Sequence, residues 1–249
     1  MKQACLIFII FFLASMSGCL AGRENNQDVK FEVTTNVQNG TIIETYVDGE
    51  LESMQECHFL FEFSSESDLS KISTYGINSS EIEITINPKE NSIINLTISH
   101  HGLYNILAFA IDENGHRVEK TITIIVELQM KWREEGTSEP KPMPFKSFNT
   151  GSQTHPSSTL ITSLVKNPSI TDDFTGGRAV DITWNIADEL NEICQSHSDE
   201  VGDGETVEWK TIYFNTIGSH ELRVNYDDGQ DLIDIEHTLH IQYQKPEAS

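Results

Sequence analysis

The chain alternates apolar and polar residues over many short segments, each bounded by turn-forming residues. In the clearest segment, Cys57, Phe59, Phe61 and Phe63 occupy every second position. A period of two predicts a β-strand with one buried face, because successive side chains of a strand point to opposite sides. The same alternation is found at residues 29–35, 82–86 and 94–98.

Residues 102–127 predict a β-hairpin. Tyr104–Ile111 and Arg117–Val126 are strand-like, and the sequence Asp-Glu-Asn-Gly at residues 112–115 is typical of a tight turn. Together with the preceding segments they give about seven short strands between residues 29 and 128, with no helical pattern. This arrangement predicts an all-β domain with an immunoglobulin-like sandwich fold.

The second half repeats this organisation. Strands are predicted at residues 160–165, 179–186 and 206–214, and the second of these has apolar residues on one face. An acidic turn at Asp227–Gly229 separates two further strands, at residues 218–226 and 233–243, which predicts a second closing hairpin. We therefore expect a second immunoglobulin-like sandwich at residues 159–245, in tandem with the first at residues 29–128.

Residues 129–158 interrupt the alternation. Four prolines, at positions 140, 142, 144 and 156, lie among Gly, Ser, Thr and Lys. Proline removes backbone donors and stiffens the chain into an extended form. The composition predicts a Pro-rich linker between two domains. The alternative is one long ordered loop inside a single domain, although structureless loops of this length are uncommon in compact domains.

The end of the first half resembles the corresponding part of a PKD-type domain, a member of the immunoglobulin-like sandwich group. Gly102 and Tyr104 open a strand, an Asp-x-x-Gly turn begins at Asp112, and residues 122–126 are a final hydrophobic stretch. The second half departs from this pattern, because His220 stands where the family has a tyrosine. The resemblance implies roles in extracellular spacing, adhesion or carbohydrate association, without catalysis by the module itself.

The first 18 residues resemble a lipoprotein signal peptide. Lys2 precedes an apolar run at residues 6–14 that is too short to cross a bilayer, and Ser-Gly-Cys follows it. The resemblance implies that Cys19 becomes the lipidated first residue of the mature protein. Residues 19–28 would then be a polar tether, with the folded part on the extracytoplasmic face of the cell membrane. The alternative is an uncleaved anchor in which Cys19 is an ordinary thiol.

The formal charge is −23, with 39 acidic and 16 basic side chains. This charge argues against binding nucleic acid or anionic lipid headgroups, because both would be repelled. It favours solubility, or else divalent-cation binding or a saline environment. Two acidic stretches are candidates for calcium, which takes oxygen ligands from flexible loops, although solvated turn carboxylates are the preferred explanation. The candidate ligands are Asp199, Glu200, Asp203, Asp227, Asp228 and Asp231.

Two cysteines remain in the expected folded part. Cys57 and Cys194 fall in different predicted domains, and in an oxidising compartment they could form a disulfide that joins the two. The alternative is a pair of free, buried thiols that behave as small apolar groups.

Three N-x-Ser/Thr sequences are candidate glycosylation sites, at Asn39, Asn78 and Asn95. Their modification requires an organism that glycosylates exported proteins. An archaeal source would meet this condition, and it agrees with the acidic composition and the leader.

Motifs for catalysis are missing from the sequence. It contains no Gly-x-Ser-x-Gly, no phosphate-binding glycine-rich loop and no cysteine in an activating context. We therefore expect a non-enzymatic, lipid-anchored surface protein without a cofactor, unless it binds calcium. Its expected role is to bind or adhere to a protein or glycan. The alternative is a structural spacer or an accessory subunit of an envelope complex, with no ligand of its own.

Overall fold

The computed structural model describes residues 30–65, 71–79, 82–147, 154–169, 178–229 and 232–244. The expected signal peptide, Cys19 and the tether lie outside these residues, as does Asp231. The described part consists of strands and their connections, which confirms the all-β class. None of the described residues belongs to a helix that is long and apolar enough to cross a membrane.

Sixteen strands follow one another in the described part of the chain. Those of the first half are β1 (Phe31–Thr35), β2 (Asn39–Val47), β3 (Glu50–Gln55), β4 (Cys57–Ser65), β5 (Ile72–Asn78), β6 (Glu83–Ile86), β7 (Ile93–Ile98), β8 (Gly102–Asp112) and β9 (Arg117–Thr137). Those of the second half are β10 (Met143–Lys146), β11 (Ser158–Lys166), β12 (Val180–Asp188), β13 (Ile193–Val201), β14 (Thr206–Tyr213), β15 (Ser219–Asp228) and β16 (Ile233–Gln242).

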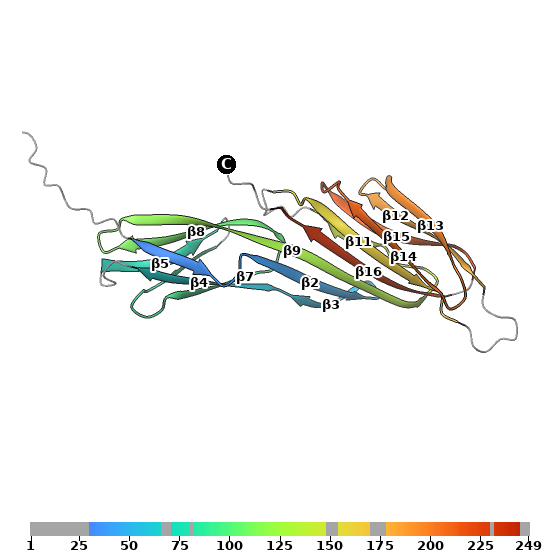
Figure 1. The fold of residues 1–249 in the computed structure, drawn as a ribbon, viewed down its shortest axis with the longest axis horizontal. Coiled ribbons are helices and arrows are strands. Elements are labelled where there is room, and N and C mark those ends of the chain that lie inside the picture. Colours follow the sequence, from blue (N-terminus) through green and yellow to red (C-terminus); the bar gives the residue numbers. More distant parts are fainter. Residues whose placement is uncertain are drawn as a thin grey trace, which may run out of the picture.

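A nine-stranded sheet runs through the whole elongated molecule (Figure 1). Its main path has the order β14-β11-β16-β9-β8-β5-β6, and β2 and β3 extend it beside β9. The sheet β1-β4-β7 packs on one half of it, and the sheet β10-β15-β12-β13 packs on the other. The molecule is therefore two β-sandwiches that share one large sheet.

Strand β9 belongs to both sandwiches. Along one edge it pairs first with β8 and then with β16, while β2 runs parallel to it along the opposite edge. Its even-numbered side chains are buried from Ile124 to Glu134, without interruption between the two halves. The buried apolar residues of both sandwiches accordingly form one continuous core.

The prediction of a linker at residues 129–158 is wrong. Strand β9 continues to Thr137, and β10 lies within the same range. The alternation of apolar side chains goes on at Met130 and Trp132, and both edges of β9 are paired there. One of the prolines, Pro144, lies in β10, which pairs on one side only, a position where a missing N–H is tolerated.

The Phe-rich strand β4 lies in the core of the first sandwich. Phe59, Phe61 and Phe63 are buried, as the alternation predicts. Phe63 stacks on Tyr75 of the opposite sheet, with ring centroids 4.9 Å apart. The hairpin at residues 102–127 is also confirmed, because β8 and β9 pair in antiparallel fashion around the expected turn.

Trp184 is a large aromatic residue in the core of the second sandwich. It lies on the buried face of β12, as predicted, and its Nε1 donates to Ser163 Oγ of the opposite sheet at 2.6 Å. The predicted second closing hairpin, however, is wrong. Strand β15 pairs with β10 and β12, whereas β16 pairs with β11 and β9. The two strands therefore lie in opposite sheets, and their apolar faces meet across the core.

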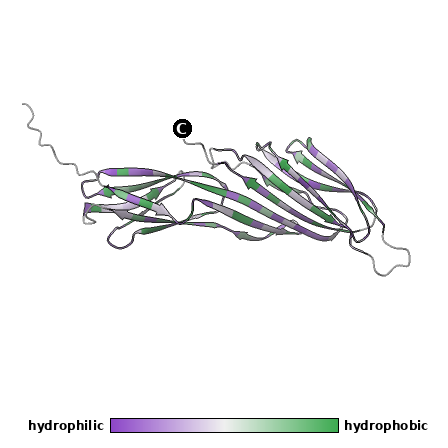
Figure 2. Ribbon diagram, viewed as in Figure 1, coloured by the Kyte–Doolittle hydropathy of each residue, from purple (hydrophilic) through white to green (hydrophobic). Residues whose placement is uncertain are grey.

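The strands of both sandwiches carry alternating apolar and polar bands (Figure 2). In the part of the large sheet that belongs to the second sandwich, one side is mostly buried and the other faces solvent. This second side is a regular surface on which paired strands hold the side chains in rows.

Candidate functional site

The solvent-facing side of the large sheet in the second sandwich is here called the open sheet face. It is formed by β14, β11, β16, β9 and β2, whose register aligns side chains in rows across five strands. These side chains are half-buried or exposed. The three central rows are Glu208–Leu164–Glu236–Arg133–Val47, Lys210–Thr162–Thr238–Lys131–Thr45 and Ile212–Leu160–His240–Gln129–Ile43.

Hydrogen-bonding groups and aliphatic carbons alternate over this face. The hydroxyl groups of Thr162 and Thr238 lie side by side in its middle row, and Leu160 and Leu164 flank Thr162 along β11. Such a surface offers both hydrogen bonds and apolar contact to a ligand that lies flat on it.

A side-chain hydrogen bond connects one of these rows to the next position of β9 on this face. His240 Nε2 is 2.8 Å from Glu127 Oε2, which links β16 to β9 on the open sheet face. This bond fixes the position of both side chains. At the edge of the face, Phe214 directly follows β14, and its side chain is 72% exposed. Its ring is thus accessible to a ligand at this edge.

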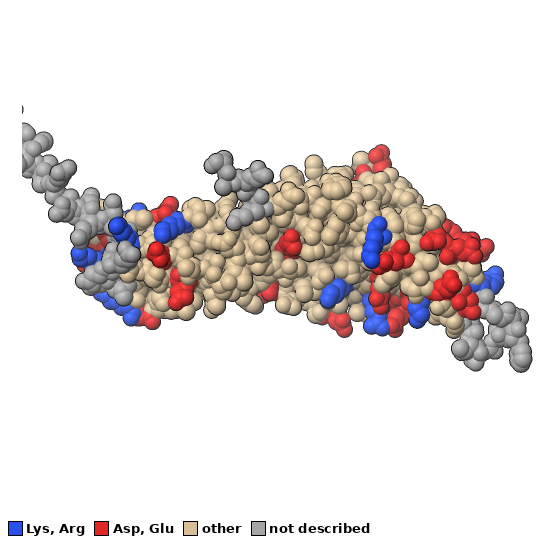
Figure 3. Space-filling model, viewed as in Figure 1, with Lys and Arg blue, Asp and Glu red and all other residues tan. Residues whose placement is uncertain are grey.

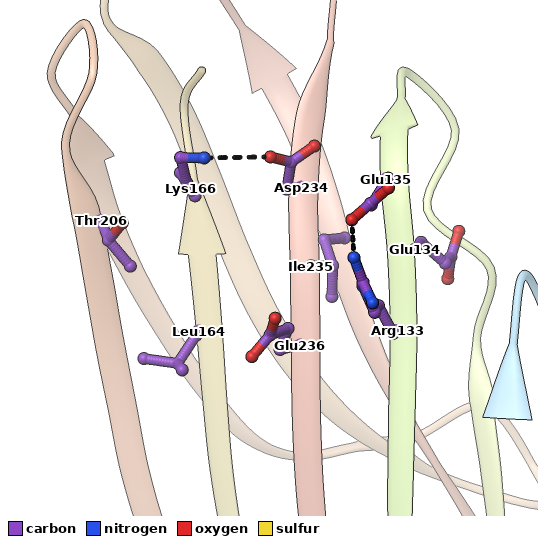
Figure 4. A pocket seen from close by; sticks show the side chains of 9 residues that line it. All are labelled: Arg133, Glu134, Glu135, Leu164, Lys166, Thr206, Asp234, Ile235 and Glu236. Atoms are coloured by element: carbon purple, nitrogen blue, oxygen red, sulfur yellow. Dashed lines mark hydrogen bonds and ion pairs between the residues drawn. The ribbon is translucent and has the colours of Figure 1, made fainter. Parts of the chain in front are cut away.

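A shallow pocket of about 240 Å³ lies at one end of the open sheet face (Figure 4). Lys166 Nζ and Asp234 Oδ2 are 3.5 Å apart in it, and Arg133 pairs with Glu135. Its cationic side chains are thus already paired with carboxylates. Figure 4 shows Leu164 and Glu236 below the Lys166–Asp234 pair in this view.

Glu134 is the buried carboxylate at this pocket, and its role is structural. Its Oε1 accepts hydrogen bonds from Trp132 Nε1 at 2.8 Å and from the backbone N–H of Lys141 at 3.1 Å. These bonds hold the β9–β10 connection against the end of β9. The carboxylate is therefore committed to backbone and indole donors and is not arranged as a catalytic acid or base.

Charged side chains gather toward the two ends of the molecule on the side seen in Figure 3, and its middle carries few of them. A ligand that crosses the middle of that side would meet mainly uncharged groups. The whole chain is strongly acidic, so an anionic ligand would be repelled at long range. A neutral ligand would not be repelled.

A second hollow, here called the end pocket, lies where β12 ends and β15 begins. It has a volume of about 530 Å³. Its walls come from β10, the β12–β13 turn and β15. The rings of Phe145 and His220 stack on each other at 5.5 Å between centroids, and both are almost fully buried. Arg223 donates to Glu221 Oε2 and to Asn191 Oδ1, so its charge is already paired.

The two cysteines do not form the disulfide that sequence alone allowed. Both are free: Cys57 is buried in β4, and Cys194 is exposed in β13. Burial also raises the pKa of the Cys57 thiol. The alternative of two buried thiols therefore holds for Cys57 and fails for Cys194, which lies in an edge strand.

The candidate calcium ligands lie on β13, on β15 and in the turn after β13. Glu200 and Asp228 pair with Asp181 from either side, while Asp227 accepts a hydrogen bond from Thr183 Oγ1 at 2.7 Å. Within the described ranges, which exclude Asp231, the side chains form no group of three that could hold a metal ion. The structure thus places Glu200 and Asp228 in one row, on either side of Asp181. The other described candidates lie outside this row.

The three candidate glycosylation sites lie on the first sandwich. Asn39 begins β2 and Asn95 lies in β7, and both side chains are exposed. Asn78 ends β5, and its Nδ2 donates to Glu83 Oε2 at 2.6 Å. In the sequence around Asn95, Thr97 Oγ1 is 3.0 Å from His58 Nδ1.

No protein-family model matches the chain, and no curated protein matches it significantly in sequence. Similar solved structures include carbohydrate-binding modules from the β-sandwich superfamily, with a TM-score of 0.32 and 11% identity over 88% of this chain and 99% of the other. The fibronectin(III)-like modules of Clostridium thermocellum CbhA give a TM-score of 0.26 and 14% identity, over 78% of this chain and 91% of theirs.

A third structure is SGBP-B of the Bacteroides ovatus mixed-linkage glucan utilization locus, in complex with a mixed-linkage heptasaccharide. Its TM-score is 0.20 and its identity 12%, over 80% of this chain and 52% of the other. These values assign no ligand to this chain. The function must therefore be argued from its own surfaces.

Proposed function

We propose that the protein is a lipid-anchored, non-catalytic binding module whose open sheet face binds an extended glycan. The observation that carries the proposal is the layout of that face. Threonine hydroxyls, an amide, aliphatic side chains and five charged side chains stand in register across five strands, and Phe214 is exposed at the edge. A sugar chain presents the matching mixture of hydroxyl groups and C–H faces.

The sheet makes this surface rigid before any ligand arrives. Four of its five strands are paired on both edges, which fixes the spacing of the side chains. A preorganised site loses little conformational entropy on binding, so many weak contacts can add up to useful affinity. The expected ligand is neutral, because anions would be repelled by the acidic molecule.

Binding to soluble polysaccharides tests this proposal. Thr238 lies in the middle of the open sheet face, and T238R places a long cation where a sugar ring would rest. We expect this variant to lose at least about tenfold in affinity, measured by affinity electrophoresis or calorimetry on a polysaccharide panel. T121R is the matched control, since Thr121 is exposed on the part of β9 that belongs to the first sandwich. Equal binding by both variants would disprove the assignment.

The proposed anchor has a separate test. Intact-mass analysis of membrane-extracted protein should show a chain that begins at a lipidated Cys19. A mass that begins at Met1, or an unmodified Cys19, would remove the anchor from the proposal and leave glycan binding unaffected.

The second candidate function is a rigid spacer in an envelope complex. The observation that favours it is the shared strand β9, which passes through both sandwiches without a break. A spacer without a ligand would bind no member of the polysaccharide panel.

A further inference from the structure

Three exposed aliphatic side chains lie close in sequence to residues that line the end pocket, and we take them as its rim. Leu190 lies in the β12–β13 turn, between two residues that line the pocket, and is 74% exposed. Ile217 precedes the pocket-lining Ser219 by two positions and is 69% exposed, and Ile193 at the start of β13 is also exposed. Aliphatic side chains this exposed around a hollow are a common feature of protein-binding surfaces.

The same pocket is a poor place for a sugar. Its two rings, Phe145 and His220, are 3% and 2% exposed, so neither offers a face on which a sugar could stack. Tyr213 also packs edge-on against His220, at 4.9 Å between centroids. The accessible apolar groups are the aliphatic ones at the rim, and these match the aliphatic side chains of a peptide.

The charges at the pocket favour a cationic occupant. Asp188, Glu189 and Glu221 line it, and Glu192 is exposed in the same turn. Two cationic side chains, Lys146 and Arg223, also line the pocket; Arg223 is paired with Glu221, and the acidic groups outnumber the cationic ones. Burial lowers the pKa of His220, which lies in the pocket wall. The carboxylates of Asp188 and Glu189 partly offset this effect, because they raise that pKa.

We propose that the end pocket docks a short peptide segment of a partner protein, one that combines lysine or arginine with leucine-like side chains. An aliphatic side chain of the segment would enter between Leu190 and Ile217, and its cationic groups would face Glu189 and Glu192. This site is distinct from the open sheet face, so the module could hold a glycan and a protein partner at once.

A fluorescein-labelled hexapeptide of alternating lysine and leucine is a suitable probe, read by fluorescence anisotropy. We expect it to bind at least about tenfold more tightly than a glutamate–leucine or a lysine–serine hexapeptide. Raising the salt from about 0.05 M to 0.5 M should weaken binding, because the Debye length then falls to a few ångströms.

Two substitutions locate the site. L190S removes the exposed aliphatic group and E189K reverses one charge, and each should weaken binding of the lysine–leucine peptide by about tenfold. The matched controls are L51S and E52K in β3, where both side chains are exposed and neither lines the pocket, and these should bind like the unmodified protein. Thermal unfolding of each variant checks that the fold is intact.

Several outcomes would overturn the proposal. Equal binding of the three peptides, or equal binding by L190S and L51S, would show that the pocket is not the site. Displacement of the peptide by a neutral oligosaccharide would assign the pocket to a glycan. Leu190-dependent self-association would make this end a contact between copies of the chain, and Leu190-dependent binding to phosphatidylcholine vesicles would make it a lipid contact. T238R should leave peptide binding unchanged, which keeps this test separate from that of glycan binding.

Discussion

Nδ1 of His101 and the phenol oxygen of Tyr243 lie 2.8 Å apart, although 142 positions separate the two residues. His101 precedes β8 in the first sandwich, and Tyr243 follows the last strand of the second. Burial lowers the pKa of His101 to about 4, so the ring is neutral at pH 7 and can accept a hydrogen bond from the tyrosine O–H. The contact therefore ties the two sandwiches together in a buried place.

Tyr243→Phe tests this contact. The substitution keeps the ring and removes the hydroxyl, so we expect the free energy of unfolding to fall by about 1 to 2 kcal/mol. Urea denaturation monitored by tryptophan fluorescence measures the change. Tyr46→Phe is the control, because the Tyr46 hydroxyl bonds to Glu44 at a partly exposed site, and it should cost less. An equal cost for the two variants would contradict the role assigned to Tyr243.

Stability should decrease as the pH falls below 6.5, because of buried histidines. Burial lowers the pKa of His237 to about 3, whereas the unfolded chain has an ordinary value of 6.5. Below 6.5 the unfolded state binds a proton that the folded state does not, so protonation favours unfolding. His237 alone should cost about 1 to 2 kcal/mol between pH 6.5 and pH 5, at roughly 1.4 kcal/mol per pH unit.

The measurement is the free energy of unfolding in urea at pH 7, 6 and 5. His237→Leu should flatten this pH dependence by nearly one proton, even if the variant is less stable at pH 7. His58→Gln, at an exposed position of β4, is the control. A slope that is unchanged in the His237 variant would show that this ring does not set the pH dependence.

The two thiols should react at very different rates. Cys194 is exposed, while Cys57 is buried and has a raised pKa. Because the thiolate is the reactive form, iodoacetamide should modify Cys194 in the native protein and Cys57 only after unfolding. Peptide mapping by mass spectrometry separates the two sites. A disulfide-linked peptide containing both cysteines would contradict the structure.

Gly76 should be irreplaceable for a steric reason. A methyl group at this position would lie about 2.2 Å from Cζ of Phe109, whose ring is fully buried beneath the guanidinium group of Arg117. Gly76→Ala therefore forces the ring to move, at a cost of about 1 to 3 kcal/mol. Gly115→Ala is a useful comparison, because no atom lies within 4 Å of the added carbon there and only the positive φ of 86° opposes it. The melting temperatures of both variants measure the difference.

Local alternation was enough to predict many of the strands and their buried faces, although it missed β3, β5, β10 and β13. The apolar positions of β4 and β12 are buried as expected, since a period of two leaves one choice of inward face. It was not enough to predict which sheet each strand joins. Strands β15 and β16 are joined by an acidic-glycine turn like that of a hairpin, yet they lie in opposite sheets. Turn residues specify a reversal of direction and not the pairing that follows it.

The linker error has a related cause. The prolines after residue 139 are typical of a linker, and the alternation through Met130 and Trp132 allowed the last strand to continue only as far as Trp132, whereas β9 extends to Thr137. The open sheet face could not be predicted from the sequence either. Its rows join side chains from strands far apart in the chain, such as Thr45, Thr162 and Thr238. Each strand contributes an ordinary polar position, and only the register shows that these positions form one surface.

Strand β9 also has a mechanical consequence. A force applied between β1 of the first sandwich and a ligand on the second sandwich would travel along the continuous backbone of β9, with its ladders loaded in shear. The two sandwiches would resist this force as one rigid unit, because β9 and the core are continuous between them. For the same reason a cut at residue 128 would not yield two intact sandwiches. It would divide β9, one of the two strands that pair with β16.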